Sequence, residues 1–367
     1  MSWIQSETSD GVDPDSVIIR IGSNSSKSVR TGYVHIYGEE QTYIIKVTQT
    51  PVDFSFDPDD KLIPICEKIT YSEATDKIEY LVVDQEVNGL KYTGCAHRYP
   101  DSDEVIIELN DILSDTLRNN ISFAEGLQEM DGYVKKFGIL NQDDGGGAII
   151  YSYKAWEKPK WPLLNDPISN VVDPRQYVFI NYLDAYDNLT LHQNGEQIGA
   201  LDKICGCAYV VPRDEAVCGE EVWYDVKAAG EDILAVQNYI YKSTDKNYAL
   251  YYINAYGGWD SLAIRGNVVQ TDNIQSQTYK NKTNGKVKYL NQITPSWSLN
   301  TGAMSDGSKM FHLLESTQVY LHNLETDEIT PVVITDTSCV YKTYSNQGNT
   351  RFYMTINVEA ANYKIRK

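Results

Sequence analysis

Short runs of β-branched and aromatic residues, separated by polar turn sequences, open the chain. The runs fall at residues 17–21, 33–37 and 43–47, with Gly-Ser-Asn-Ser-Ser and Gly-Glu-Glu between them. Alternating segments of this kind are typical of strands joined by tight turns. The pattern ends near Pro51, so we predict a first β domain over residues 1–52.

The strand pattern resumes beyond an acidic linker at residues 57–60, with one interruption of helical spacing. Apolar residues at 109, 112, 113 and 117 would lie on one face of a helix, which predicts a short helix near 109–120. We therefore predict a β-sandwich domain over residues 53–155. Its expected strands are 78–83, 90–96, 105–109 and 148–153.

The remaining residues, 156–367, are also dominated by short strand-like runs. A second short helix is predicted at 305–316, where Ser305 would supply the N-cap. Whether this β-rich region is separate from residues 53–155 or discontinuous with them stays open. Because strands dominate every region, we predict a mainly β, multi-domain protein of antiparallel β-sandwiches with one or two short helices. The expected strands are 176–182, 207–211, 221–226, 234–241, 248–254, 261–265, 317–322, 330–334, 338–343 and 351–358.

Tyrosine is the most unusual feature of the composition. The chain has 28 tyrosines and only 7 phenylalanines. A tyrosine ring has a large apolar face and a polar tip, which suits half-buried strand surfaces and wet protein interfaces. Two interpretations stay open: a tyrosine-rich β core alone, or a surface that packs against other protein chains.

The formal net charge of -19 narrows the class of partner. Affinity for nucleic acid comes from Lys and Arg on phosphates, so we expect no nucleic-acid partner. An anionic membrane surface is disfavoured for the same reason. The acidity favours solubility and cationic partners.

The N-terminus and the cysteines indicate where the chain is made. The first residues lack a basic segment followed by an apolar one, and no stretch approaches the ~18 apolar residues of a membrane span. Six cysteines in 367 residues are too sparse for a disulfide scaffold. We therefore expect a protein made in a cytoplasm, with no membrane anchor.

Residues that could carry chemistry are scarce. The five histidines are in no HExxH or H-x-x-x-H pattern, and neither a G-x-S-x-G nor a Walker motif is present. Cys205, Cys207 and Cys218 are weak candidates for a metal site, because C-x-C is tighter than the usual zinc spacing. We expect no enzyme, no catalytic or cofactor-binding residue, no cofactor and no metal.

Five short segments near the N-terminus carry a family resemblance: Trp3-Ile4, Gly11, Asn24, Arg30-Thr31-Gly32 and Thr42–Gln49. With these segments, residues 3–49 resemble the second half of a BACON domain, an immunoglobulin-like β-sandwich found in Bacteroidetes proteins and their phages. Such domains have further strands before the position of Trp3, so the resemblance implies a partial sandwich that a neighbouring chain completes, for example by strand addition.

Three further stretches carry a second resemblance: Tyr92-Thr93-Gly94 followed by Val105–Asp115, Ala249–Leu262, and Leu313–His322 leading into Pro331–Thr335. With these stretches, much of the remainder, roughly residues 75–367, resembles tail proteins of phages that infect such bacteria, including crAss-like phages. This resemblance implies a subunit of the tail or tail hub, with no catalytic residues to transfer.

The leading hypothesis is therefore a structural subunit of a phage tail, at the tail hub or the tail–fibre junction. The resemblance implies a homo-oligomeric ring, neighbours among tail, portal-proximal or fibre proteins, and a place in the virion after synthesis in the host cytoplasm. An alternative is a glycan-binding tail module for host adsorption, with Trp3 and the loop at 156–161 as stacking surfaces. A tail-associated glycoside hydrolase is less favoured, because the required pair of carboxylates is set in three dimensions.

One motif stands out as a structural or interface element. Tyr256-Gly257-Gly258-Trp259-Asp260 places two glycines, which permit positive φ or close backbone approach, before a large aromatic residue. Trp259 would anchor this turn in a core or in an interface. Trp3 is the second candidate, because of its place in the partial first domain.

Overall fold

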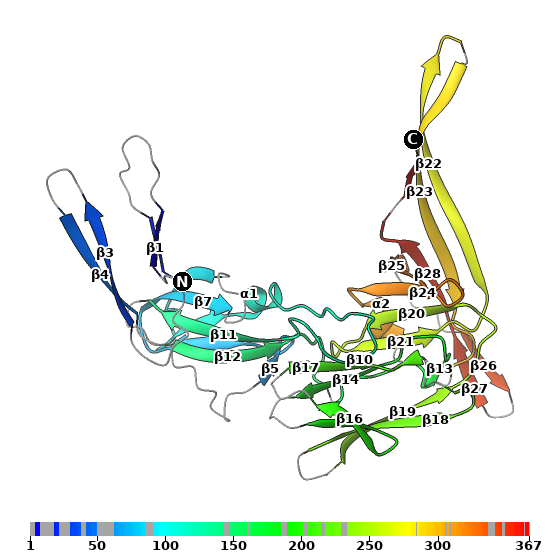
Figure 1. Cartoon of the computed structure of the whole chain (residues 1–367), viewed down its shortest axis with the longest axis horizontal. Coiled ribbons are helices and arrows are strands. Elements are labelled where there is room, and N and C mark those ends of the chain that lie inside the picture. Colours follow the sequence, from blue (N-terminus) through cyan, green and yellow to red (C-terminus); the bar gives the residue numbers. More distant parts are fainter. Residues whose placement is uncertain are drawn as a thin grey trace.

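The structure is a computed structural model of the whole chain (Figure 1). It describes the backbone of strands 4–7, 18–21, 30–37 and 42–49. Beyond them it describes residues 62–84, 91–142, 147–159, 162–184, 189–200, 205–213, 217–228, 233–283, 285–304, 307, 310–336, 342–346, 349–362 and 364–366.

The predicted N-terminal strands are confirmed. β1 (Ile4–Glu7) pairs with β2 (Ile18–Ile21), and β3 (Arg30–Tyr37) pairs with β4 (Thr42–Gln49), both antiparallel. Trp3 lies outside the described residues, so its predicted role stays a prediction.

A five-stranded sheet and a short ribbon enclose the first described core. Side chains from the sheet, from the ribbon and from a helix fill it, including Ile78, Phe137, Ile107 and Leu113. The sheet runs in the order β5 (Leu62–Pro64), β12 (Gly147–Tyr153), β11 (Val134–Asn141), β7 (Lys77–Asp84) and β8 (Lys91–His97). The ribbon pairs β6 (Thr70–Glu73) with β9 (Val105–Glu108), and the helix is α1 (Asn110–Ser114).

α1 is shorter than the helix predicted at 109–120. After Ser114 the chain leaves the helix, and the backbone N–H of Arg118 donates to the carbonyl of Gly132. Asn120 then pairs with Asp131 in an antiparallel bridge. Pairing with another segment therefore ends the helix early, although Leu117 stays buried as its spacing predicted.

Two further sheets form a sandwich in which the inner one is buried on both faces. The inner sheet has β14 at one edge, and its residues alternate: Ile180 and Tyr182 face one core, while Phe179 and Leu183 face another. The inner order is β10 (Gly126–Glu129), β17 (Cys205–Val210) and β14 (Phe179–Asp184). The outer order is β13 (Val171–Val172), β19 (Ile233–Tyr241), β18 (Glu221–Lys227), β15 (Thr190–Gln193) and β16 (Glu196–Ala200).

An eight-stranded sheet packs against the other face of the inner sheet. In its strand β20, Tyr251 faces the core shared with Phe179, whereas Leu250 and Tyr252 face a fourth core under α2 (Met310–Leu314). Its path is β21 (Trp259–Ala263), β20 (Tyr248–Ile253), β24 (Val319–Asn323), β25 (Glu328–Ile334), β28 (Thr355–Ala360), β23 (Gly285–Asn300) and β22 (Val268–Asn281), with β29 (Lys364–Arg366) also on β23. β26 (Lys342–Asn346) and β27 (Asn349–Tyr353) form a separate hairpin.

The predicted fold class is confirmed: the described chain is mainly β, with packed, mostly antiparallel sheets and two short helices. The second predicted helix, 305–316, is present only as α2, Met310–Leu314. Neither helix in the described part is long and apolar enough to cross a membrane. No strand was predicted from the sequence at the longest strands, β22 and β23, or at the hairpin of β15 and β16.

Candidate functional site

The Gly257-Gly258 turn lies where three segments of the chain meet. Gly257 has a φ of +79°, and a Cβ atom there would collide with the backbone carbonyl of Lys154. A Cβ on Gly258 would collide with the carbonyl of Leu164. Both glycines therefore allow a close backbone approach that a larger residue would prevent.

Trp259 lies in the core rather than at the surface. It is 2% exposed and packs with Phe179 and Tyr320. Tyr256 is half-buried, and its backbone carbonyl accepts a 2.7 Å hydrogen bond from the Tyr133 hydroxyl. Of the two roles considered for this motif, the structure places it in the role of a core anchor.

Asp260 completes this buried cluster as a hydrogen-bond acceptor. Its carboxylate accepts from the side-chain amides of Asn165 (2.8 Å) and Asn254 (2.7 Å) and from the backbone N–H of Asp166 (3.1 Å). Burial raises the pKa of Asp260 to about 6, and the hydrogen bonds oppose that rise. All three partners lie within the same chain, so the carboxylate is used in holding the fold.

The three cysteines considered as metal ligands do not form one site. Cys205 and Cys207 are neighbours on β17, with sulfurs 3.5 Å apart in a buried core. Cys218 is exposed, and its sulfur accepts from the backbone N–H of Ser243. The described residues contain no group of three His, Cys, Asp or Glu side chains suited to a metal ion.

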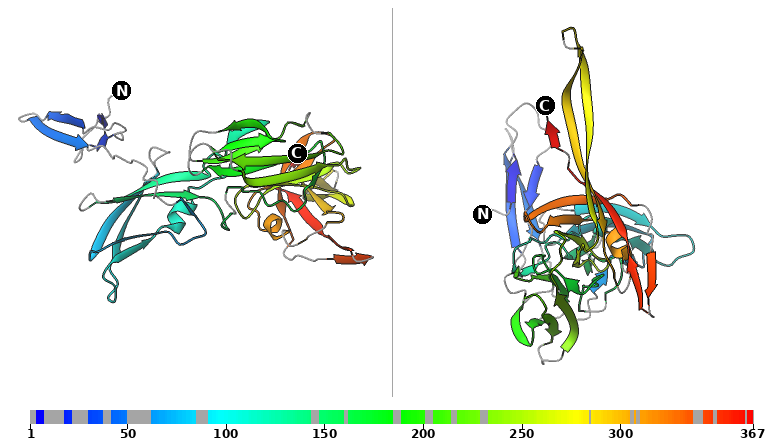
Figure 2. Two further views of the ribbon diagram at one scale, coloured as in Figure 1. Left: turned by 90° about the horizontal axis from the view of Figure 1, so that it is seen from below. Right: turned by 90° about the vertical axis from the view of Figure 1, so that its right-hand side faces the viewer.

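The most distinctive surface feature is the hairpin of β22 and β23, which rises from the body of the protein (Figures 1 and 2). We call it the arm. β23 pairs with β28 over Ser296–Asn300 and with β29 over Asn291–Ile293. β22 ends the sheet and has β23 as its strand partner in the described chain. Every side chain from Val269 to Lys280 is exposed.

The tip of the arm has two chemically different faces. Cross-strand partners in an antiparallel pair share a face. Lys280 lies opposite Lys286 and Thr278 opposite Lys288, which places three lysines on one face. On the other face Tyr279 lies opposite Val287, and its ring is 6.0 Å from that of Tyr289. The tip is therefore cationic on one side and aromatic on the other.

The charge of the arm is opposite to that of the rest of the chain. Residues 268–300 contain four lysines and one acidic residue, Asp272. The other residues include 28 basic and 50 acidic ones, a formal charge of -22. The tip extends roughly 20 Å past its last contact with β29 at ~3.3 Å per residue. That exceeds the ~8 Å Debye length at physiological salt, so the tip acts as a separate basic surface.

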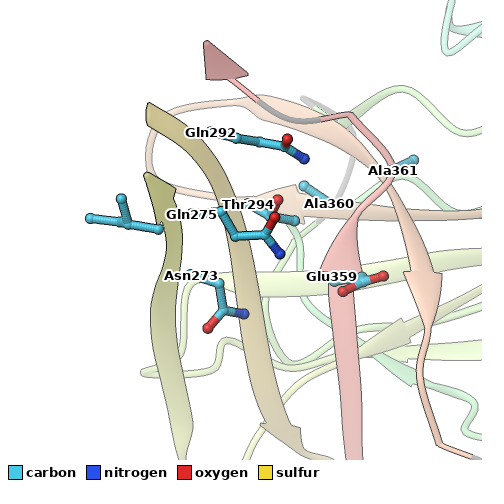
Figure 3. Close-up of a pocket in the computed structure, with 8 residues that line it drawn as sticks. Asn273, Gln275, Gln292, Thr294, Glu359, Ala360 and Ala361 are labelled. Atoms are coloured by element: carbon cyan, nitrogen blue, oxygen red, sulfur yellow. The ribbon is translucent and has the colours of Figure 1, made fainter. Parts of the chain in front are cut away.

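A polar groove lies at the base of the arm, where the arm meets the end of β28 (Figure 3). Its volume is about 630 Å³. Side-chain amides and hydroxyls dominate its lining, and Glu359 is the carboxylate among the lining residues. The lining consists of Asn273, Ile274, Gln275, Gln292, Thr294, Glu359, Ala360 and Ala361. Such a surface suits a neutral ligand that is rich in hydroxyl or peptide groups.

Of the aromatic residues predicted to stack on sugars, the structure describes Trp156, which is not among the residues that line the groove. Trp156 is 43% exposed, and the ammonium of Lys154 lies 5.7 Å above its ring. Trp3 and Trp161 are outside the described residues. The groove and the arm are therefore the candidate binding surfaces of the described chain.

Comparison with known proteins assigns no family. No protein-family model and no curated protein matches the sequence. Among solved structures, one with some likeness is the SGBP-B protein of the Bacteroides ovatus mixed-linkage glucan utilization locus, in complex with a mixed-linkage heptasaccharide. It is 8% identical, the match covers 96% of this chain and 86% of that chain, and the TM-score is 0.20. A likeness at that score carries no inference about this chain.

Proposed function

We propose that this protein is a non-enzymatic structural subunit that assembles with other protein chains through its arm. The arm is the observation that carries the proposal. An isolated two-stranded ribbon is at best marginally stable in water, and an open strand edge is a template for pairing. Val269, Ile274, Tyr279 and Tyr289 are exposed along it, so a partner would bury apolar area that this chain leaves in water.

The setting that we propose is the tail of a bacteriophage, as a homo-oligomer at the tail hub or tail–fibre junction. The sequence resemblance to phage tail proteins supports this setting, and the arm supports the assembly. Protein interfaces are enriched in aromatic residues, and an open strand edge can pair with a strand of another chain, so the exposed aromatic and strand-edge groups of the arm suit assembly. Other tail, portal-proximal or fibre proteins are the neighbours expected there.

Shortening the arm tests the assembly. Gln277 and Leu290 are cross-strand partners, so residues 278–289 can be replaced by Asn-Gly, a favoured two-residue hairpin turn. The change removes the lysine and tyrosine surfaces and keeps the residues that pair with β29. We expect unchanged circular dichroism and thermal unfolding, with loss of the oligomers that sedimentation of the full chain detects. A shortened protein that sediments like the full chain would overturn the proposal.

Locating the chain in particles tests the setting separately. We expect electron microscopy of purified virions, with the chain labelled, to place it at the tail. Labelled particles without signal at the tail would overturn the phage setting, while the sedimentation result would still decide the assembly.

The groove of Figure 3 favours a second candidate function, glycan binding in host adsorption. Its amides and Glu359 offer the paired donors and acceptors that sugar hydroxyls need. We expect this function to appear as binding on a glycan array that Gln275→Ala and Gln292→Ala abolish. Gln270→Ala, on the opposite face of the same strand, is the control. An array without signal for the full chain would exclude it.

The groove does not supply what a glycoside hydrolase requires. Hydrolysis of a glycosidic bond uses two carboxyl groups roughly 5–10 Å apart. Glu359 is the carboxylate among the residues that line this groove. We therefore keep a non-enzymatic role in the proposal.

A further inference from the structure

The outer edge of β22 is a long strand edge that borders no other strand of the described chain (Figure 1). Natural proteins protect such edges with proline, with a bulge, with charged side chains or with a covering segment. β22 contains no proline, and Asp272 is its one charged residue before Lys280. The register shift in the arm adds Tyr289 to β23 and leaves β22 regular. The backbone donors and acceptors along this edge are therefore open to a strand of another chain.

Three large apolar side chains are exposed on β22 at equal spacing. Val269 is 58%, Ile274 59% and Tyr279 48% exposed, and each lies five residues from the next. A second copy of β22 that pairs antiparallel about Ile274 therefore brings Ile274 opposite its own copy. In the same pairing, Val269 of each copy lies opposite Tyr279 of the other. All three apolar side chains then have an apolar cross-strand partner, which stabilises a sheet.

Backbone geometry restricts the registers in which two copies of β22 pair. Along a regular strand, the N–H and C=O groups of successive residues point alternately to the two sides of the strand. Both members of a cross-strand pair must therefore come from the same alternating set, so their residue numbers add to an even number. Among these antiparallel registers, the one centred on Ile274 matches all three apolar residues. Centring on Val269 or on Tyr279 matches one of them, and every other even register matches none.

Charge favours the antiparallel pair over a parallel one. A parallel pair in register also matches the apolar residues, but it sets Asp272 and Lys280 beside their own copies, and like charges in such positions are destabilising. In the antiparallel pair, Lys280 lies opposite Val268, and Asp272 lies opposite Ser276. The two copies of Lys280 are then roughly 40 Å apart along the ribbon at ~3.3 Å per residue. That separation exceeds the ~8 Å Debye length at physiological salt, so the tips do not repel each other.

We infer that two copies of this chain pair through the outer edges of their β22 strands, antiparallel and centred on Ile274. This inference rests on the proposed assembly through the arm, and it names the partner surface as the same strand of a second copy. The arm extends beyond the body, so the two bodies lie at opposite ends of a shared four-stranded ribbon (Figures 1 and 2). A two-fold contact closes on itself and yields dimers, so a larger ring uses a further surface.

The residue at the centre of the pair gives the first part of the test. Ile274→Lys sets a lysine opposite its own copy, and Ile274→Glu does the same with a carboxylate. Each variant alone should weaken self-association roughly tenfold or more in sedimentation experiments. An equimolar mixture of the two variants should restore association to within about tenfold of the wild type, because a lysine then lies opposite a glutamate. Circular dichroism should be unchanged, since the side chain of Ile274 is exposed.

The outer pair of residues tests the register. Val269→Lys alone and Tyr279→Glu alone should each weaken self-association, because each sets a charge opposite an apolar residue. Both changes in one chain should restore it, since the new lysine of one copy lies opposite the new glutamate of the other. Within one chain the two positions are roughly 33 Å apart at ~3.3 Å per residue, so they cannot pair there. The matched control is Ile106→Lys on β9, an exposed position outside the arm, which should sediment like the wild type.

The outcomes separate this inference from the proposed function. If the shortened arm abolishes assembly but both Ile274 variants sediment like the wild type, the β22 contact is overturned and the proposed function stands. If the single variants weaken association and neither the mixture nor the double variant restores it, the pairing centred on Ile274 is overturned. If the full chain is a monomer and its arm pairs with a different tail protein, the second copy is overturned as the partner. If the shortened arm assembles normally, both the inference and the proposed function are overturned.

Discussion

The indole Nε1 of Trp259 donates a 3.0 Å hydrogen bond to Oδ1 of Asn119, a residue 140 positions earlier in the chain. The amide nitrogen of Asn119 in turn donates to the backbone carbonyl of Gly257. One buried side chain therefore binds both the turn and the tryptophan that follows it. This pair fixes the segment after α1 against β21, and so joins two regions that are distant in sequence.

Trp259→Phe should show how much this pair contributes. Phenylalanine keeps an aromatic ring but leaves the buried Asn119 oxygen without its donor and creates a small cavity. We expect the free energy of unfolding to fall by about 2 kcal/mol or more. Urea unfolding measures it, with Trp156→Phe, at an exposed position, expected within about 0.5 kcal/mol of the wild type. Equal effects of the two changes would contradict the role of the pair.

Gly257→Ala and Gly195→Ala separate steric fit from backbone conformation. Both glycines have positive φ, +79° and +87°, so each substitution should cost about 1 kcal/mol for that conformation. A methyl group at 257 also meets the Lys154 carbonyl, whereas no atom lies within 4 Å of one at 195. We expect Gly195→Ala to stay folded and Gly257→Ala to be more destabilised by several kcal/mol in urea unfolding. Similar losses in the free energy of unfolding at both sites would contradict a close backbone approach at Gly257.

The strands that could be predicted are those that bury at least one face. β18, β19, β20 and β25 lie close to their predicted bounds, because apolar residues recur where they face a core. The arm was missed for the same physical reason. The side chains of β22 from Val269 to Lys280 are all exposed, and in β23 Leu299 is the one described side chain that is fully buried, so neither alternation nor an apolar run marks these strands. The Asn194-Gly195 turn between β15 and β16 does carry a sequence signal for a hairpin, because both residues have positive φ and Asn-Gly favours a two-residue turn.

The candidate site was only partly visible in the sequence. The two glycines before Trp259 marked a close approach, but whether an aromatic residue faces a core or a partner depends on the packing around it. The net charge of the whole chain does not reveal the basic arm, because it sums the charge of the arm with that of the acidic remainder. A net charge of -19 argues against anionic partners for the chain as a whole, yet four lysines fall within residues 280–288 with no acidic residue among them. Local charge decides what a protruding segment binds.

The described cysteines should differ in thiol reactivity according to how deeply each is buried. Cys66, Cys95 and Cys218 are exposed, and Cys205 and Cys207 are buried. The hydrogen bond with Cys205, together with burial, raises the pKa of the Cys207 thiol, which keeps it from ionising to the reactive thiolate. We expect iodoacetamide at neutral pH to label Cys95 and Cys218 within minutes and Cys66 more slowly, because partial burial raises the pKa of the Cys66 thiol. The buried pair should be labelled only after unfolding. Peptide mass spectrometry reads each site, and rapid labelling of Cys207 would contradict the buried core.

Asp260 should make stability depend on pH in an unusual direction. Its pKa is raised by burial from 3.8 to about 6 in the folded chain, whereas the unfolded chain keeps the ordinary value. Between those two pH values Asp260 is ionised in the unfolded chain but still protonated in the folded chain. The contribution of Asp260 to the free energy of unfolding is therefore greatest below pH 4 and falls as the pH rises towards 6. A difference of about 2 pKa units corresponds to about 3 kcal/mol. Buried Asp173 contributes in the opposite sense: burial acts to raise its pKa, but hydrogen bonds from Arg175 and from the backbone N–H of Thr244 outweigh it and hold the pKa below the ordinary value.

Comparison with Asp260→Asn isolates this contribution, because the other titrating groups are common to both proteins. The variant loses part of the hydrogen bonding to Asn165 and Asn254, so it should be less stable in acid. The difference in free energy of unfolding between the wild type and the variant should shrink by about 1 kcal/mol between pH 5 and pH 7. This range lies above the pI of about 4.6. Urea unfolding at half-unit steps of pH measures the difference. A difference that stays constant or grows with pH would show that the Asp260 carboxylate is stabilised in its ionised form.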